Sequence, residues 1–196
     1  MRVVSGLGSA ALLLAVVSTA TAGQLKGMVK VTGLKSSADA VVYVDAIAGK
    51  TFPAPTTHAK VDQKNLVFLP HVLPVLQGTT VDFVNDDAVL HNVFSPDKCC
   101  ENFNLGSWPK GQSRSYAFKS LCRATMLCHV HPEMEAFVAV LPTPWFAVTD
   151  KLGAYSIKDV PDGAYTIKVW HPKVKAEVSK PVTVAGVTSA DFAMKK

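Results

Sequence analysis

The chain has 196 residues, of which 48% are hydrophobic and 18% are charged, and its formal net charge is +5. This composition excludes a disordered chain and indicates an ordered, well-packed protein. The lysines and arginines are scattered, without an arginine-rich or aromatic-interleaved patch, so we expect no nucleic-acid partner. A modest positive charge instead favours docking to an acidic protein surface.

Residues 1–22 have the features of a secretory signal peptide. Arg2 gives a basic start, residues 8–17 form a short apolar run, and Ala20-Thr21-Ala22 fits a cleavage rule with cutting before Gly23. The alternative is an uncleaved N-terminal anchor. No later segment is apolar for long enough to form a transmembrane helix. We therefore expect a periplasmic or secreted protein without stable membrane insertion.

The rest of the chain predicts an all-β protein, because short β-branched and aromatic runs alternate with turn signals and no helical periodicity is sustained. The segment from Asp97 to Trp108 mixes Cys, Asn, Gly and charge, so we expect a loop there that can hold one helical turn. The predicted strands are Leu25–Val31, Ala40–Val44, Leu66–Phe68, Val81–Val84, Asn92–Phe94, Ser113–Phe118, Ala124–Cys128, Ala136–Val140, Trp145–Val148, Ala154–Ile157, Ala164–Trp170 and Val182–Val184.

Two proline-containing segments, Thr51–His58 and Leu141–Pro144, are predicted to connect separate folding units. Between them lies a stretch of roughly 80 residues, which is domain-sized. The sequence leaves open whether the flanks form one split sandwich or two separate additions.

The middle unit contains the pattern that carries the chemistry. Cys128, His131 and Met134 follow the spacing C-x2-H-x2-M, and His91 lies upstream. Two imidazoles, a thiolate and a distant thioether are the ligand set of a blue-copper site. His91 directly precedes one predicted strand and Cys128 ends another, so neighbouring strand ends can bring them together. Asn92, next to His91, is a candidate for hydrogen bonds that link the segments carrying the ligands.

Residues 60–141 resemble the cupredoxins. Phe68-Leu69-Pro70, Val75, Gly78, Val81, Phe83, Asn85 and His91-Asn92-Val93 are similar to the plastocyanin-like pattern, and the Cys128–Met134 loop resembles that of amicyanins. The resemblance implies a Greek-key β-sandwich over residues 58–141. It also implies one mononuclear type 1 copper, bound by His91, Cys128 and His131 with Met134 axial.

The flanks resemble a second family, the carboxypeptidase regulatory-like (transthyretin-like) sandwiches. The residues that carry this similarity are Gly27-Met28-Val29, Val41–Val44, Ala147–Tyr155 and Val160–Val169. The resemblance implies that residues 23–57 and 142–196 form one sandwich into which the copper-binding domain is inserted. This sandwich carries no catalytic set, so we expect a structural or docking role.

The remaining histidines are not predicted to be ligands. In an extended segment the side chain of His129 points opposite to that of Cys128, so we expect it at the surface. A structural or near-site role is predicted for His71, and surface positions for His58 and His171. Glu133 places a charge near the exposed edge of the site.

Export places the other cysteines in an oxidising compartment, where unused thiols tend to pair. Cys122 is predicted to pair with Cys99 or Cys100, and Cys100–Cys122 is the candidate disulfide. The alternatives are a strained Cys99–Cys100 bridge and a second metal site that uses all three thiols.

The predicted function is that of an electron carrier, not an enzyme, which shuttles single electrons between redox proteins. The alternatives are a copper-binding or storage protein without fast electron transfer, and a structural two-domain β protein with a degenerate site. Zinc would gain little from a thioether ligand. A dinuclear copper-A centre needs C-x3-C, whereas Cys122 and Cys128 give C-x5-C.

Overall fold

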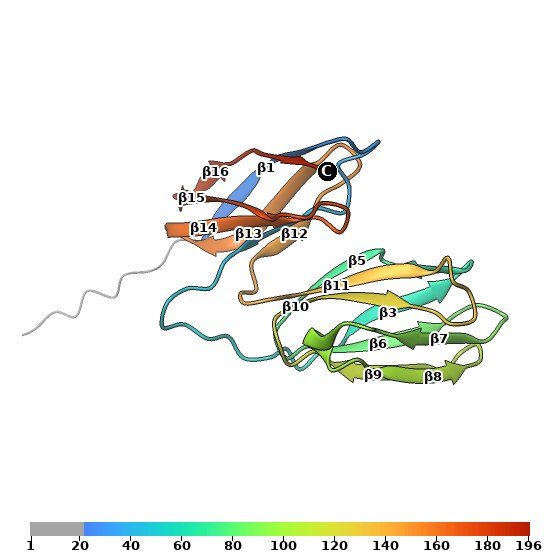
Figure 1. Ribbon diagram of the computed structural model, residues 1–196. Helices are drawn as coiled ribbons and strands as arrows, with labels where there is room; N and C mark the ends of the chain where they lie inside the picture. Colours follow the sequence, from blue (N-terminus) through green and yellow to red (C-terminus); the bar gives the residue numbers. More distant parts are fainter. Residues whose placement is uncertain (1–21) are drawn as a thin grey trace, which may run out of the picture.

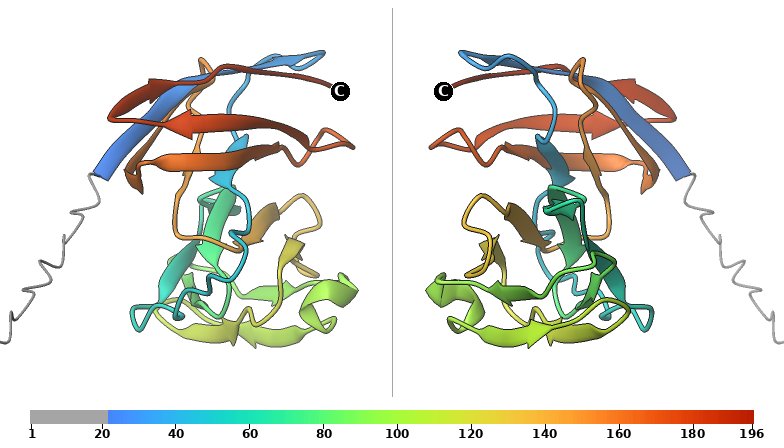
Figure 2. Two further views of the ribbon diagram at one scale, coloured as in Figure 1. Left: turned by 90° about the vertical axis from the view of Figure 1, so that its left-hand side faces the viewer. Right: turned by 90° about the vertical axis from the view of Figure 1, so that its right-hand side faces the viewer.

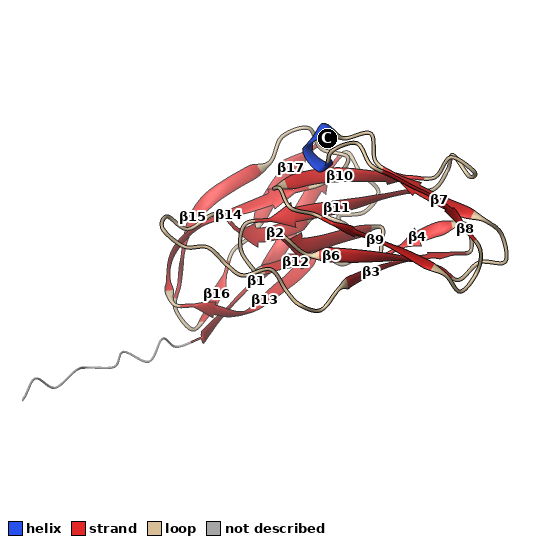
Figure 3. Cartoon of the chain, turned by 90° about the horizontal axis from the view of Figure 1, so that it is seen from below, coloured by secondary structure: helices blue, strands red, loops and turns tan. Residues whose placement is uncertain are grey.

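The computed structural model describes residues 22–196, and it is built almost entirely of β-strands (Figures 1 and 3). Within this range the helical structure is a single 3₁₀ turn, η1 (Lys98–Cys100). The prediction of an all-β protein is confirmed. The predicted signal peptide, apart from Ala22, lies outside the described residues. Among the described residues, no helix has the length and apolarity needed to cross a membrane.

Strands from the two ends of the chain form one β-sandwich. One sheet has the order β13-β1-β16, with β17 also paired to β1, and the other has the order β12-β2-β14-β15. A single hydrophobic cluster that includes Leu25, Val42 and Ile167 fills the space between them. The strands are β1 (Ala22–Thr32), β2 (Val41–Val44), β12 (Phe146–Val148), β13 (Ala154–Pro161), β14 (Gly163–Trp170), β15 (Val178–Val184), β16 (Val187–Ser189) and β17 (Phe192–Lys195).

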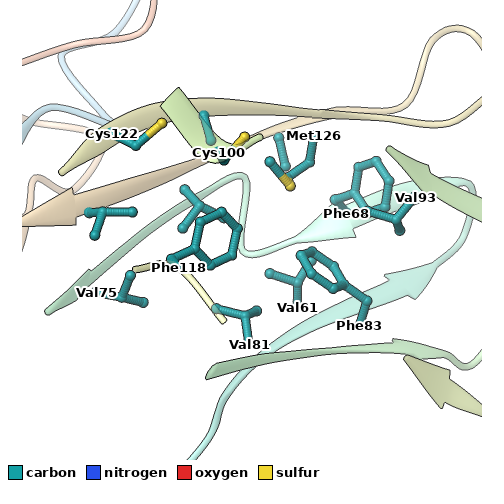
Figure 4. Packing of buried hydrophobic residues seen from close by; sticks show 14 of the residues in the cluster. Val61, Phe68, Val75, Val81, Phe83, Val93, Cys100, Phe118, Cys122 and Met126 are labelled. Carbon is teal, nitrogen blue, oxygen red and sulfur yellow. The ribbon is translucent and has the colours of Figure 1, made fainter. Parts of the chain in front are cut away.

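The middle of the chain forms a second sandwich, which lies below the first in Figure 2. Its sheets have the orders β4-β3-β6-β9 and β5-β11-β10-β7-β8. Figure 4 shows Phe68, Phe83, Val93, Phe118 and Met126 packed in the core between these sheets. The strands are β3 (Ala59–Lys64), β4 (Val67–Leu69), β5 (Val72–Leu76), β6 (Thr80–Asn85), β7 (His91–Phe94), β8 (Asn104–Trp108), β9 (Ser113–Ala117), β10 (Cys122–Leu127) and β11 (Glu135–Leu141).

Sequence patterning missed several strands whose residues have weak intrinsic β-preference. β8 has the sequence Asn-Leu-Gly-Ser-Trp and falls in the segment predicted to be a loop, although the predicted helical turn is present as η1. β8 is ordered by antiparallel pairing with β7, in which Trp108 lies opposite His91. β3 is largely polar and is held between β4 and β6. Such strands depend on their neighbours, because β-propensity is strongly context-dependent.

The two sandwiches contact each other through a small apolar cluster and a polar network. Val41 and Tyr43 of β2 pack with Ala139 and Leu141 of β11. Beside them, Arg123 of β10 forms an ion pair with Glu177, with a nitrogen-to-oxygen distance of 2.9 Å. The Tyr43 hydroxyl donates to Glu177 Oε2 at 2.8 Å and accepts a hydrogen bond from Arg123. Charged, aromatic and aliphatic groups therefore hold the two units together.

The structure corrects the predicted disulfide. Cys99, not Cys100, is bonded to Cys122, so the Cys100–Cys122 pairing was wrong. The two cysteines are consecutive in η1 and point in different directions. Cys99 is exposed and meets Cys122, whereas Cys100 is buried and its thiol donates to Ser95 Oγ and the Asp97 carbonyl. Burial raises the pKa of the Cys100 thiol, which keeps it protonated.

The domain boundaries at 57/58 and 141/142 stay a prediction that limited proteolysis can test. We expect cleavage within the exposed segment of residues 48–58, because exposed proline-containing connections are preferred sites of nicking. After cleavage, the fragment that contains β1 and β2 should stay bound to the fragment that contains β13 and β14 on a native gel. Release of the N-terminal fragment alone would contradict the predicted split sandwich.

Candidate metal centre

Pairing between β7 and β10 brings together His91 and Cys128, which are distant in sequence. The strands are antiparallel neighbours, with Leu127 opposite Phe94. Cys128 follows directly after β10 and His91 is the first residue of β7, so both lie at the same end of the sheet. Together with His131 they form a cluster whose potential ligand atoms all lie within 4.8 Å of one another.

The two imidazoles approach each other closely. Nδ1 of His91 lies 3.1 Å from Nδ1 of His131, and the rings are inclined at 61°. The other nitrogen of His91, Nε2, lies 2.8 Å from the Asp87 carboxylate. An ionised carboxylate accepts a hydrogen bond from Nε2–H, and the tautomer protonated at Nε2 leaves Nδ1 with a free lone pair directed at the cluster.

Asp87 is itself held in position by the backbone. Its two carboxylate oxygens accept hydrogen bonds from the N–H groups of Asn65 and Leu66, at 2.6 and 2.9 Å. Burial alone would raise the pKa of Asp87. The Leu66 and Asn65 amides and the His91 ring outweigh burial and lower that pKa below its usual value, so Asp87 remains ionised.

Asn85 fixes the turn that carries Asp87. It is completely buried, and its side-chain amide donates to the carbonyls of Val89 and Trp108. Its side-chain oxygen accepts a hydrogen bond from the backbone N–H of Asp87. The segment between β6 and β7 is therefore tied to β8, which limits the movement of the Asp87–His91 pair.

Asn92 links the segments around the cysteine. Its backbone N–H points at Cys128 Sγ at 3.5 Å, and its side-chain oxygen accepts from the backbone N–H of His129 at 3.3 Å. Its side-chain nitrogen donates to Asn104 Oδ1 and to the Gly106 carbonyl. Cys128 is only 3% exposed, so its sulfur lies in a dry environment next to an oriented N–H donor.

The loop after Cys128 turns back into the core. The Met134 N–H donates to the His131 carbonyl at 3.0 Å, which closes a tight turn. Met134 is 1% exposed and belongs to the same buried cluster as Cys128. His131 is half-buried, while Pro132 and Glu133 are exposed. His91, Cys128 and His131 are thus clustered at one end of this sandwich, and Met134 is linked to His131 through the backbone.

The other histidines lie elsewhere. His129 is exposed and stacks on Phe94, with ring centroids 3.7 Å apart. His71 pairs with Asp39 of the other sandwich at 2.8 Å, and the exposed His58 pairs with Asp82 at 2.9 Å. His171 was wrongly predicted to be at the surface. It is 2% exposed, because its ring bonds to the Ala38 carbonyl and to the Lys173 N–H.

The donor set fits a thiophilic transition metal. Two nitrogen ligands, each about 2 Å from a metal, are separated by roughly 3 to 3.5 Å, and the two Nδ1 atoms are 3.1 Å apart. Two imidazoles with one thiolate and a weak thioether suit copper, whereas hard cations such as Ca²⁺ and Mg²⁺ require oxygen ligands.

Known structures with similarity to this chain include a purple cupredoxin, amicyanins and a Cu-containing nitrite reductase. A purple cupredoxin from Nitrosopumilus maritimus is 26% identical, with 42% of this chain and 98% of that chain covered and a TM-score of 0.38. An amicyanin variant in its reduced state is 23% identical, with 50% and 98% covered and a TM-score of 0.40.

A Cu-containing nitrite reductase (NirK) from Thermus scotoductus SA-01 is 23% identical over 51% of this chain and 25% of that chain, with a TM-score of 0.43. No family model matches the sequence. No curated protein matches it either.

The sequence pattern does not reveal the role of Asp87 or the structural role of Asn85. Asn85-Asp86-Asp87 is a typical turn sequence and predicts only a turn. A carboxylate four residues before a candidate metal-binding histidine was a signal that could have indicated an orienting group. The choice between Asp86 and Asp87 could not be made from spacing alone, because it depends on the direction in which the turn leaves β6.

We predict that Asp87→Ala lowers metal affinity about 10- to 100-fold, because loss of an outer carboxylate frees the tautomer and orientation of a ligand histidine. Competition titration with a chelator measures this. Asp82→Ala is the matched control, since it removes the other aspartate–histidine pair of the same sandwich and should leave metal affinity unchanged. Equal affinities for the two variants would contradict a role of Asp87 at the centre.

Proposed function

We propose that this protein is a type 1 (blue) copper protein that carries single electrons between redox partners outside the cytoplasm. The observation that carries the proposal is the convergence of the His91 and His131 Nδ1 atoms with the Cys128 sulfur. Copper held there would alternate between Cu(I) and Cu(II). The proposed ligands are His91, Cys128 and His131, with Met134 as a long axial contact and Asn92 and Asp87 as supporting groups.

The arrangement of the protein groups suits electron transfer because hydrogen bonds within the protein hold the candidate ligands in place. His91 is held by Asp87, and the sulfur of Cys128 is faced by the Asn92 amide. A hydrogen bond to a ligand sulfur stabilises its negative charge and tunes the reduction potential. Ligands that move little between two oxidation states require little reorganisation, which favours fast transfer.

Exposed side chains near His131 offer a place for a redox partner to dock. Val130 is 48% exposed and Leu90 is 53% exposed, next in sequence to the ligand candidates His131 and His91. Glu133 adds an acidic group to the same loop. The net positive charge of the chain predicts a partner with an acidic surface, which Glu133 would repel. Lysines elsewhere on the molecule would therefore have to attract such a partner.

We predict an intense visible absorption and an EPR signal typical of a Cu(II)–thiolate bond in the oxidised protein, both lost in Cys128→Ser. Cys100→Ser is the matched control, because Cys100 is the other unpaired, buried cysteine among the described residues and should leave both signals intact. A colourless protein that nevertheless binds copper would overturn the proposal. Slow electron self-exchange with a normal spectrum would favour copper storage instead.

We further predict that Met134→Leu keeps copper and the visible band but raises the reduction potential. An axial thioether donates weakly to copper and favours the Cu(II) state, so its loss favours Cu(I). Cyclic voltammetry measures the shift. Met126→Leu, in the same buried cluster, is the matched control and should leave the potential unchanged. An unchanged potential in Met134→Leu would exclude Met134 as a ligand.

A further inference from the structure

A cleft of about 590 Å³ lies between the two sandwiches. Its walls come from the connection after β2, the β5–β6 turn, the β9–β10 connection and the start of the connection to β12; these connections can be followed in Figures 1 and 2. The residues that define its character are Lys50, Phe52, Leu76, Lys119, Leu121 and Pro142. The volume is within the range of small-molecule sites.

The cleft has an apolar surface. Leu76 and Leu121 both line it; Leu76 is buried, while Leu121 remains 49% exposed. Phe52 is half-buried and packs edge-on against Trp145, with ring centroids 5.2 Å apart. These groups provide an apolar surface that a ligand with a hydrocarbon portion can cover, and covering it would remove apolar area from water.

The charge on the cleft is of one sign. Lys50 and Lys119 line it, and no aspartate or glutamate does. Among residues 22–196, neither lysine ammonium takes part in an ion pair. The backbone next to Lys119 is fixed, because its carbonyl accepts from Gln77 Nε2 at 2.9 Å and the Phe118 carbonyl accepts from the Gly78 N–H at 2.7 Å.

We propose that this cleft binds a small amphipathic anion, such as a medium-chain carboxylate. The carboxylate would lie between the Lys50 and Lys119 ammonium groups, and the hydrocarbon portion would contact Phe52, Leu121 and Pro142. The walls include parts of both connections between the sandwiches. The bound anion would therefore also stabilise the arrangement of the two sandwiches relative to each other. The proposal does not depend on copper, since no metal-ligand candidate lines this cleft.

Octanoate is the probe for the test. The protein, with and without copper, is titrated with octanoate and binding is followed by calorimetry. Tryptophan fluorescence is a second readout, because Trp145 contacts Phe52 at the cleft. We expect saturable binding at one site in both forms and a rise in melting temperature. Octanamide, of equal length but uncharged, should bind about tenfold more weakly, because a charge-assisted hydrogen bond is lost.

The variant Lys50→Ala/Lys119→Ala should weaken octanoate binding by about tenfold or more, towards the affinity for octanamide. Lys30→Ala is the matched control, because Lys30 is an exposed lysine on β1 that does not line the cleft. This variant should bind octanoate normally. Inorganic phosphate, which lacks an apolar portion, should bind much more weakly than octanoate. Equal binding of octanoate and octanamide, undiminished binding by the double variant, or no saturable binding would each overturn the proposal.

Discussion

The candidate metal centre depends on a set of hydrogen bonds made by one asparagine. Asn92 directs its backbone N–H at the Cys128 sulfur, accepts from the His129 N–H, and donates to Asn104 and the Gly106 carbonyl. These bonds join β7, the loop after β10 and β8. Since Asn92 directly follows His91 and bonds to Cys128 and His129, this single buried residue fixes the position of His91 relative to Cys128.

A second group of contacts acts on the opposite side of His91. Asp87 holds the ring through Nε2, two backbone amides hold Asp87, and Asn85 ties their turn to β8. Taking a carboxylate even partly out of water, as at Asp87, is costly without such partners. The two groups of contacts fix His91 from both sides, so the cluster can be rigid although its members come from separate segments.

The contact between the sandwiches is smaller and more polar than either core. Arg123 bonds to Glu177 and lies over the rings of Tyr43 and Trp170, while His71 reaches Asp39. The Asp39 pKa is lowered, chiefly by the His71 hydrogen bond, and this effect outweighs the burial that opposes it. Such a contact can orient two units while each keeps its own hydrophobic core, as expected of neighbouring domains.

The sequence by itself determined the all-β class, most of the strands with strong β-preference, and the spacing of Cys128, His131 and Met134. These features are local: alternation, turn residues and short spacings are properties of contiguous residues. It also placed His129 correctly at the surface, although this residue lies in a bend after β10 and not in an extended segment.

Only the tertiary structure decided which cysteine pairs with Cys122, which aspartate orients His91, and that β8 and β3 are strands. Each depends on contacts between residues distant in the chain. Cys99 and Cys100 are equivalent in sequence until η1 turns one outward and one into the core. Likewise, Asp87 differs from Asp86 only because the β6–β7 turn brings it against His91 and the Asn65 and Leu66 amides. The local sequence pattern does not indicate which way these side chains face, because the packing of the whole sandwich decides it.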